Sequence, residues 1–294
     1  MPMQDNINKK MNFVFWGTPD VAYQTLEILK QAGFLPSLIV TSPDARKGRG
    51  LHMGTSPVSS FAGKNNIPCL KPEKLDEKFT LKLSTFNFQL FVVVAYGKII
   101  PENILNMPKL GSINLHYSLL PKYRGASPME SAILNGDNET GVTIQKMEYK
   151  MDAGDIIAQE HTHILPDETA PELRKRLIHL GGELLVKTLK TPSASGHSPF
   201  AGGEKQDEIQ ATYCKKIKKG DGLIDLEDDA VKNYNKFRAY AAWPRTFFLA
   251  QRSLGQGGFQ NRRIIITDAE LKDEKFVIKK IIPENGKEMD YKIT

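Results

Sequence analysis

The sequence predicts an α/β protein, with a Rossmann-like parallel sheet in its N-terminal part and a small β-rich domain at its C-terminal end. Three observations support this fold class. The chain opens with an apolar run at Asn12–Gly17, a helical segment and a second apolar run at Ser37–Thr41, which is the pattern of a βαβ unit. The run Phe88–Gly97 is apolar on both faces, as a central parallel strand requires. Beyond residue 211, short β-like runs replace the alternation of strands and helices.

The first helix has clear start and stop signals. Thr18 is suited to cap its start, Pro19 fits the first helical position, and Asp20 places an acid in the first turn. Gly33 then ends the helix. A glycine turn before a helix also occurs in dinucleotide sites, but the pattern G-x-G-x-x-G is absent here. The opening therefore does not indicate an NAD site.

The later elements follow from the spacing of apolar residues. The stretch beginning at Gly111 alternates Ile113, Leu115 and Tyr117 with polar residues, which is typical of a strand. We expect further helices at about Val58–Asn65, Ser127–Gly136 and Thr169–Leu189, and further strands at Ile67–Leu70, Gly141–Met147 and Asp155–Ile164.

Composition divides the chain into a first domain at 12–190, a linker at 191–211 and a C-terminal β-rich domain at 212–294. The linker is rich in proline, serine and glycine. The net charge is +6, and residues 212–294 contain 17 lysine and arginine residues against 12 acidic ones, so +5 of it lies there. A basic domain suggests a polyanionic partner, with nucleic acid as the first candidate, although a solvated lysine-rich surface has the same composition.

The sequence indicates a cytoplasmic protein. The two cysteines, Cys69 and Cys214, lie far apart, which argues against a disulfide framework and fits a reducing compartment. No apolar run approaches the length of a membrane-spanning helix, and the first eleven residues lack the apolar core of a secretory signal. We expect no membrane partner, a monomer, and a start at either Met1 or Met11.

A basic, glycine-rich loop follows the second strand, at Ser42–Pro57. It contains the cations Arg46, Lys47 and Arg49 and three glycines. It is long for a routine connection, which favours a binding loop over a solvated flexible one, although composition fits both.

Four polar side chains are candidates for chemistry. Asn114, His116 and Ser118 have a spacing of two, which places them on one face of a strand. Asp152 lies in a turn between two strands, and ligands of parallel sheets bind outside the carboxyl ends of the strands. An amide donor, an imidazole and a carboxylate suit transfer of an acyl group to an outside nucleophile through a tetrahedral intermediate. No serine or cysteine stands in a nucleophile elbow, which argues against a covalent enzyme intermediate.

A metal site is not indicated. His161 and His163 share a face of one strand, but no third ligand is spaced with them and H-E-x-x-H is absent. We therefore interpret these two histidines as surface or structural residues.

Several motifs together resemble the methionyl-tRNA formyltransferases, a family of folate-dependent formyltransferases. They cover about residues 12–189 in order: FWGTPDVA, TSPDARKGRG, SPV, VVVAYGKIIP, GSINLHYSLLPKYRGASP, NGDNETGVTIQKM and MDAGDIIAQ. The resemblance continues more thinly in FRAYAAWPRTFF and IIPENGKEMDY. This combination is specific for folate-dependent formyltransferases and less specific for the amine that receives the formyl group.

The resemblance implies a reaction and its residues. A formyl group would pass from 10-formyltetrahydrofolate, with no metal, to the α-amino group of methionine on initiator tRNA. By motif position the catalytic residues are Asn114, His116 and Asp152. The folate-contacting segment is Ser118, Leu119, Leu120 and Pro121, and the tRNA-contacting loop contains Arg46, Lys47 and Arg49. From the sequence itself, Arg124 is expected to hold the turn or the cofactor side of the cleft at least as readily as to bind phosphate.

The resemblance also implies an OB-like C-terminal barrel that docks on tRNA, and here the chain departs from the family. Sequence that usually forms additional hairpins is missing between RRIIITDAEL and KFVIKKIIPENGKEMDY, so we expect an abbreviated barrel, short by two strands. Three other activities share the motifs of the first domain or parts of them: formyl transfer to an amino sugar nucleotide, hydrolysis of the formylated folate, and folate or RNA binding without catalysis. The intact trio argues against the last.

Overall fold

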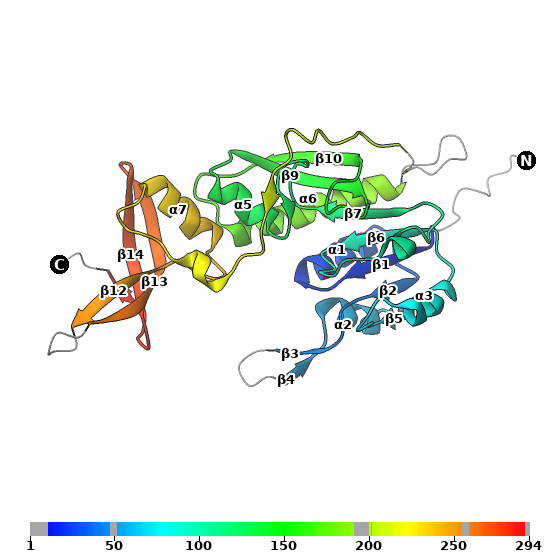
Figure 1. Ribbon diagram of the computed structural model, residues 1–294, viewed down its shortest axis with the longest axis horizontal. Coiled ribbons are helices and arrows are strands. Elements are labelled where there is room, and N and C mark those ends of the chain that lie inside the picture. Colours follow the sequence, from blue (N-terminus) through cyan, green and yellow to red (C-terminus); the bar gives the residue numbers. More distant parts are fainter. Residues whose placement is uncertain (1–10, 48–51, 191–199, 201, 254–258, 292–294) are drawn as a thin grey trace, which may run out of the picture. The chain divides into compact units, whose positions relative to one another are not determined.

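The computed structural model describes residues 11–47, 52–190, 200, 202–253 and 259–291 (Figure 1). The chain forms two compact units, each made of several chain segments. The first contains residues 1–121, 142–160 and 178–210, and the second contains 122–141, 161–177 and 211–294. The linker predicted at 191–211 falls partly outside the described residues, at 191–199 and 201.

A seven-stranded sheet, most of it in the first unit, has the strand order β10-β9-β7-β6-β1-β2-β5. Its strands are β1 (Phe13–Gly17), β2 (Leu38–Val40), β5 (Cys69–Leu70), β6 (Leu90–Val94), β7 (Ser112–His116), β9 (Glu139–Lys146) and β10 (Ile156–His163). The pairs β1–β2, β1–β6, β2–β5 and β6–β7 are parallel, whereas β9 runs antiparallel to β7. The predicted α/β class is confirmed, with a sheet that is mixed and mostly parallel.

Helices pack against the central strands of this sheet. They are α1 (Asp20–Gln31), α2 (Pro57–Lys64), α3 (Glu77–Ser84), α4 (Glu102–Leu105) and α6 (Ala170–Lys190). Every residue of β1 and β6 that carries a side chain is buried, as expected of central strands. Trp16 on β1 packs its indole against Phe79, Phe91 and Tyr96, with ring centroids 5.2–6.0 Å apart.

The start of α1 differs from the sequence expectation. The helix begins at Asp20 with Pro19 at the capping position, and no side chain caps it. Thr18 instead uses its hydroxyl away from the helix, 3.0 Å from the hydroxyl of Ser42 and 3.1 Å from the carbonyl oxygen of Tyr96, to which it donates. These bonds join the ends of three neighbouring strands, and they compete successfully with the local cap.

The second unit contains a four-stranded antiparallel sheet with the order β12-β13-β14-β15. Its elements are α5 (Pro128–Leu134), the 3₁₀ turn Lys219–Gly222, α7 (Ala230–Ala239), β12 (Phe247–Ser253), β13 (Phe259–Lys272), β14 (Lys275–Pro283) and β15 (Met289–Asp290). Ile224, Ile266 and Ala269 form its small core with partly buried Phe237 and Phe248. The small β-rich domain is confirmed. Within the described residues, no pairing of β12 with β15 closes the sheet into a barrel.

Two short strand pairs were not anticipated. In the first unit, β3 (Ala45–Lys47) and β4 (His52–Gly54) form an antiparallel hairpin within the basic loop. In the second unit, β8 (Arg124–Gly125) pairs in parallel with β11 (Tyr213–Cys214). Of the helices in the described ranges, none is both long and apolar enough to cross a membrane.

Candidate active site

Strand β7 positions the first two candidate residues. Ile113 and Leu115 point into the core and are buried, so the alternation of the strand places Asn114 and His116 together on the opposite face. The side chain of His116 is also enclosed, with 6% of the residue exposed. Asn114 is only partly buried, and its amide has no hydrogen-bond partner among the residues that the structure describes. It is therefore available to donate to a ligand.

The third candidate, Asp152, stands in the turn between β9 and β10. Its backbone is left-handed, with φ of 51°, a conformation that aspartate tolerates better than most residues. Two residues on, Gly154 lies so close to β9 that an added Cβ would sit 2.1 Å from the carbonyl oxygen of Lys146. The turn is thus pressed against the strand. It places Oδ1 of Asp152 3.7 Å from Nδ1 of His116.

Two glutamines hold the Asp152 turn. Gln145 on β9 is buried, and its Nε2 donates to Oδ1 of Asp152 at 3.0 Å. Gln206 donates from its own Nε2 to the carbonyl oxygens of Asp152 at 3.0 Å and Gly154 at 2.7 Å. A contact of 3.3 Å from the same nitrogen to Oε1 of Gln145 links the two amides. The side chain of Gln145 therefore orients the Asp152 carboxylate, and the side chain of Gln206 holds the backbone of the turn.

Neither glutamine was identified from the sequence. Gln145 lies opposite Asn114 in the β7–β9 register, so the strand pairing alone could have pointed to it. Gln206 lies in the predicted linker, 54 residues after Asp152, and no local pattern marks it.

The segment Ser118–Pro121 begins two residues after the end of β7 and is held by one threonine. The hydroxyl of Thr143 donates to the carbonyl oxygen of Ser118 at 2.7 Å and accepts from the backbone N–H of Leu120 at 3.1 Å. Gln159 donates to the same hydroxyl at 2.9 Å and to the carbonyl oxygen of Leu120 at 2.8 Å. A hydroxyl has one donor and two acceptor positions, so Thr143 uses all three here. The backbone after His116 is fixed.

The predicted basic residues lie in the hairpin that follows β2. Arg46 is exposed on β3, Lys47 ends that strand, and Arg49 lies outside the described residues. The hairpin projects from the sheet beside α2 (Figure 1). Its base is tied down by an ion pair of 2.8 Å between Asp44 and Lys71. Because β2 and β7 run in the same direction, the hairpin and the His116 site leave the sheet at the same edge.

Arg124 has a structural position in the second unit. It is fully buried, with 0% exposed. Its guanidinium lies 6.0 Å from the ring centroid of Tyr213, and Nη1 donates to the Tyr213 hydroxyl at 3.4 Å. These contacts hold β8 beside β11, which supports the expectation that Arg124 holds the turn.

The arrangement is suited to stabilising a developing negative charge. An unpartnered amide and an imidazole share one strand face, and a fixed carboxylate next to the ring can orient it and balance its positive charge. In the described part of the chain, no three His, Cys, Asp or Glu side chains gather closely enough to hold a metal ion.

Known proteins resemble this chain in sequence and in fold. Residues 9–189 match a family model described as "Formyl transferase". A methionyl-tRNA formyltransferase of Caldicellulosiruptor saccharolyticus is 42% identical over 247 residues, which cover 83% of this chain and 78% of that protein. The solved structure of a sugar 3N-formyl transferase, in the presence of dTDP and 5-N-formyl-THF, has a TM-score of 0.62 at 21% identity and covers 94% of this chain and 98% of its own. The methionyl-tRNA formyltransferase structure from Clostridium thermocellum has a TM-score of 0.55 at 18% identity, with 93% and 99% covered.

Proposed function

Because the chain belongs to the methionyl-tRNA formyltransferase family, whose members depend on folate, we propose that it transfers a formyl group from 10-formyltetrahydrofolate to initiator methionyl-tRNA. The acceptor is the α-amino group of the methionine, and the product serves translation initiation. The observation that supports this proposal most directly is the His116–Asp152 contact of 3.7 Å beside Asn114, at the edge where the strand ends meet.

In the proposed reaction, the neutral α-amine adds to the formyl carbon. Asn114 and His116 stabilise the formyl oxygen as it gains negative charge in the tetrahedral intermediate. Asp152 orients the imidazole and balances the positive charge on it. The new bond joins the amine nitrogen to the formyl carbon, the bond from that carbon to N10 of the folate breaks, and N10 gains a proton as the amine loses one. Asp152 and a water molecule are the two candidate acceptors of the amine proton.

We assign the substrates to separate parts of the site. Ser118, Leu119, Leu120 and Pro121 contact the folate, and the fixed backbone of this segment, which Thr143 and Gln159 hold, supports that role. The cations Arg46, Lys47 and Arg49 contact the tRNA. The position of Arg46 and Lys47 on a hairpin strand at the same end of the sheet supports this assignment. No metal takes part in this proposal.

We further propose that catalysis belongs to residues 12–190 and tRNA docking to residues 212–294, joined by the linker 191–211. The basic charge of 212–294 supports the second assignment. The cytoplasm is the proposed place of action, and the two free thiols, Cys69 and Cys214, are in keeping with a reducing compartment.

One assay with three acceptors tests the function. The protein is incubated with 10-formyltetrahydrofolate and, in parallel, charged initiator tRNA, an amino sugar nucleotide, or water alone. Formyl-methionyl-tRNA is expected at the highest kcat/KM. A higher kcat/KM with the amino sugar, or formate release at the same rate without tRNA, would contradict the proposal.

The same assay tests the catalytic trio. We expect His116→Ala and Asp152→Ala to lower kcat by about 10²–10³-fold, the effect of losing one oxyanion donor or its support, while the protein stays folded. Unfolding curves measured by circular dichroism show whether each variant is folded. Retention of more than about a tenth of the wild-type rate would remove the residue from the catalytic set.

A further inference from the structure

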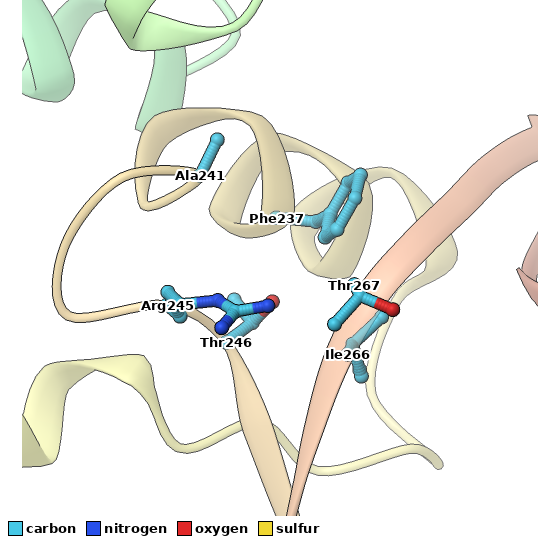
Figure 2. A pocket seen from close by; sticks show the side chains of 6 residues that line it. All are labelled: Phe237, Ala241, Arg245, Thr246, Ile266 and Thr267. Atoms are coloured by element: carbon cyan, nitrogen blue, oxygen red, sulfur yellow. The ribbon is translucent and has the colours of Figure 1, made fainter. Parts of the chain in front are cut away.

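The second unit contains a small hollow between α7, the turn before β12 and strand β13. It has a volume of about 50 Å³ and is lined by Phe237, Ala241, Arg245, Thr246, Ile266 and Thr267. One ordered water needs about 10–15 Å³ of such space, so the hollow has room for a group of several atoms. In Figure 2 the Arg245 side chain extends into the space below Phe237, toward Thr246 and the part of β13 that contains Ile266 and Thr267.

The polar groups of this lining lack partners. The hydroxyls of Thr246 and Thr267 are buried and make no hydrogen bond, and Thr246 is only 1% exposed. Arg245 is half-buried, and its guanidinium has no hydrogen-bond or ion-pair partner among the described residues. Buried polar groups without partners are uncommon and costly, because each has lost its contacts with water. Two such hydroxyls beside a guanidinium without a partner point to a missing ligand.

The backbone of Arg245 is strained and closely confined. Its φ is +67°, a left-handed conformation that favours glycine and strains other residues. Its N–H donates to the carbonyl oxygen of Tyr240 at 3.1 Å, and its own carbonyl lies where an added Cβ on Gly222 would be only 2.2 Å away. The backbone is therefore confined from both sides. Strain of this kind is often found where a side chain has a function.

A bulge in β13 brings Thr267 to the same hollow. Ile266 pairs with Ile281 and Asp268 pairs with Lys280, so Thr267 between them is an extra residue without a partner in the ladder. A bulge turns a side chain away from its ordinary direction. It explains why the consecutive residues Ile266 and Thr267 both line the hollow, although neighbours on a regular strand face opposite sides.

The chemistry of the lining fits a phosphate group. A guanidinium supplies only donors and a positive charge, two hydroxyls supply further donors, and none of the six lining residues is acidic. Arginine forks and hydroxyls are the side chains that contact phosphate oxygens in nucleic-acid complexes. Trp243, two residues before Arg245, is 55% exposed, and an exposed aromatic next to a cation is a feature of RNA-binding surfaces.

We propose that Arg245, Thr246 and Thr267 form a binding site for one phosphate group of an RNA backbone. The inference rests on the proposed function only for the identity of the RNA, which is the tRNA substrate. A phosphodiester accepts hydrogen bonds from all three side chains, supplies the charge that Arg245 lacks, and adds a fixed contact to the docking surface of residues 212–294. Free inorganic phosphate offers the same hydrogen-bond acceptors and negative charge. The experiment below distinguishes it from an RNA backbone as the ligand of this site.

The chain contains a built-in reporter for this site. Of its two tryptophans, Trp16 is fully buried in the first unit and Trp243 is exposed beside Arg245. Inorganic phosphate is titrated into the full-length protein at constant ionic strength while tryptophan fluorescence is followed. An RNA duplex of unrelated sequence is then added to the phosphate-loaded protein.

Three variants make the test specific. Arg245→Gly removes the guanidinium and also relieves the left-handed strain, so its thermal stability should equal or exceed that of the wild type. Thr246→Val removes one hydroxyl without changing the charge. Lys275→Gln, at an exposed position of β14 away from the hollow, removes a charge from the same unit as a matched control.

We expect phosphate affinity to fall at least about tenfold in Arg245→Gly, by about two- to tenfold in Thr246→Val, and not at all in Lys275→Gln. RNA should displace the phosphate. The slope of log affinity for RNA against log salt should become smaller by about one in Arg245→Gly and stay unchanged in Thr246→Val. These measurements do not use formyl transfer, so they can succeed where the proposed function fails.

Two outcomes overturn the inference. If phosphate produces no fluorescence change, or if all variants respond like the wild type, the hollow contains only water. If phosphate binds through Arg245 and Thr246 but RNA does not displace it, the ligand is a free phosphate compound rather than an RNA backbone.

Discussion

Replacement of Gln145 by leucine tests whether the Asp152 carboxylate must be held for the reaction to proceed. Leucine is similar in size to glutamine and suits a position that is only 2% exposed. The change removes one donor, the amide Nε2 that lies 3.0 Å from Oδ1 of Asp152. It also removes the 3.3 Å contact with Gln206. The other Gln206 bonds, to two backbone carbonyls of the turn, remain.

The expected magnitude follows from the type of bond that is lost. A hydrogen bond to a charged group contributes about 1.5–3 kcal/mol, so its loss lowers kcat by about 10–150-fold if the carboxylate is needed in the transition state. The KM for 10-formyltetrahydrofolate should stay within about twofold, because the folate-contacting segment is held by other residues. Gln159→Leu provides the matched control. It removes the amide that holds the Leu120 carbonyl, and it should raise the KM for folate with a smaller effect on kcat.

A double-mutant cycle separates positioning from general damage. Gln145→Leu is combined with Asp152→Asn, and single-turnover rates are measured for all four proteins. If Gln145 acts through the carboxylate, its replacement should cost little further once that carboxylate has become an amide. An equal loss in both backgrounds, or a single variant that retains more than half of the wild-type kcat, would refute the positioning role.

Three further changes test the packing around the site and in the second unit. Gly154→Ala forces a Cβ to within 2.1 Å of the Lys146 carbonyl, so the free energy of unfolding should fall by about 1–3 kcal/mol, whereas Gly202→Ala, with nothing within 4 Å, should be neutral in the same thermal melts. Tyr96→Phe removes a buried hydroxyl without a partner and should leave stability unchanged or raise it by about 1 kcal/mol. Burial raises the pKa of Tyr96 to about 12, so the folded protein keeps this proton at a pH at which the unfolded chain, with the ordinary tyrosine pKa of about 10, has lost it. Wild-type stability should therefore decrease from pH 10 to 12, and Tyr96→Phe should lessen that decrease in denaturant titrations. Arg238→Leu removes the donors to Glu168 O and Asn235 Oδ1 (3.1 and 2.6 Å), and chemical denaturation should show a loss of about 3 kcal/mol; a change below 1 kcal/mol would show that these bonds are dispensable.

The sequence predicted those parts of the fold whose signals are local. The run Leu90–Val94 is apolar at every position and can only be a buried strand or helix segment, and the alternation around Asn114 and His116 fixes their common face. The same locality explains the failure at Thr18. Its cap was predicted from its neighbours in sequence, but its hydroxyl bonds to Ser42, 24 residues away, and no local pattern contains that partner.

The hairpin β3–β4 was missed for a related reason. Glycines and cations indicate a loop by composition, while the pairing of Arg46 with Met53 depends on a register that composition does not encode. The bulge at Thr267 is likewise invisible in the apolar pattern of β13, since the inserted residue changes the direction of one side chain without changing the strand.

The sequence suggests which groups of the candidate site react, and it does not reveal the residues that hold them. Asn114, His116 and Asp152 are residue types that chemistry demands, and two of them share a strand face that period-two spacing reveals. The bonds that fix Asp152 come from Gln145 on an antiparallel neighbour and from Gln206, which lies in the predicted linker. Because the turn takes its order from a segment 54 residues away, the geometry of the site depends on chain outside the continuous stretch 12–190 that carries the motifs. A motif therefore locates the chemistry, while the precision of the site is a property of the folded first unit as a whole.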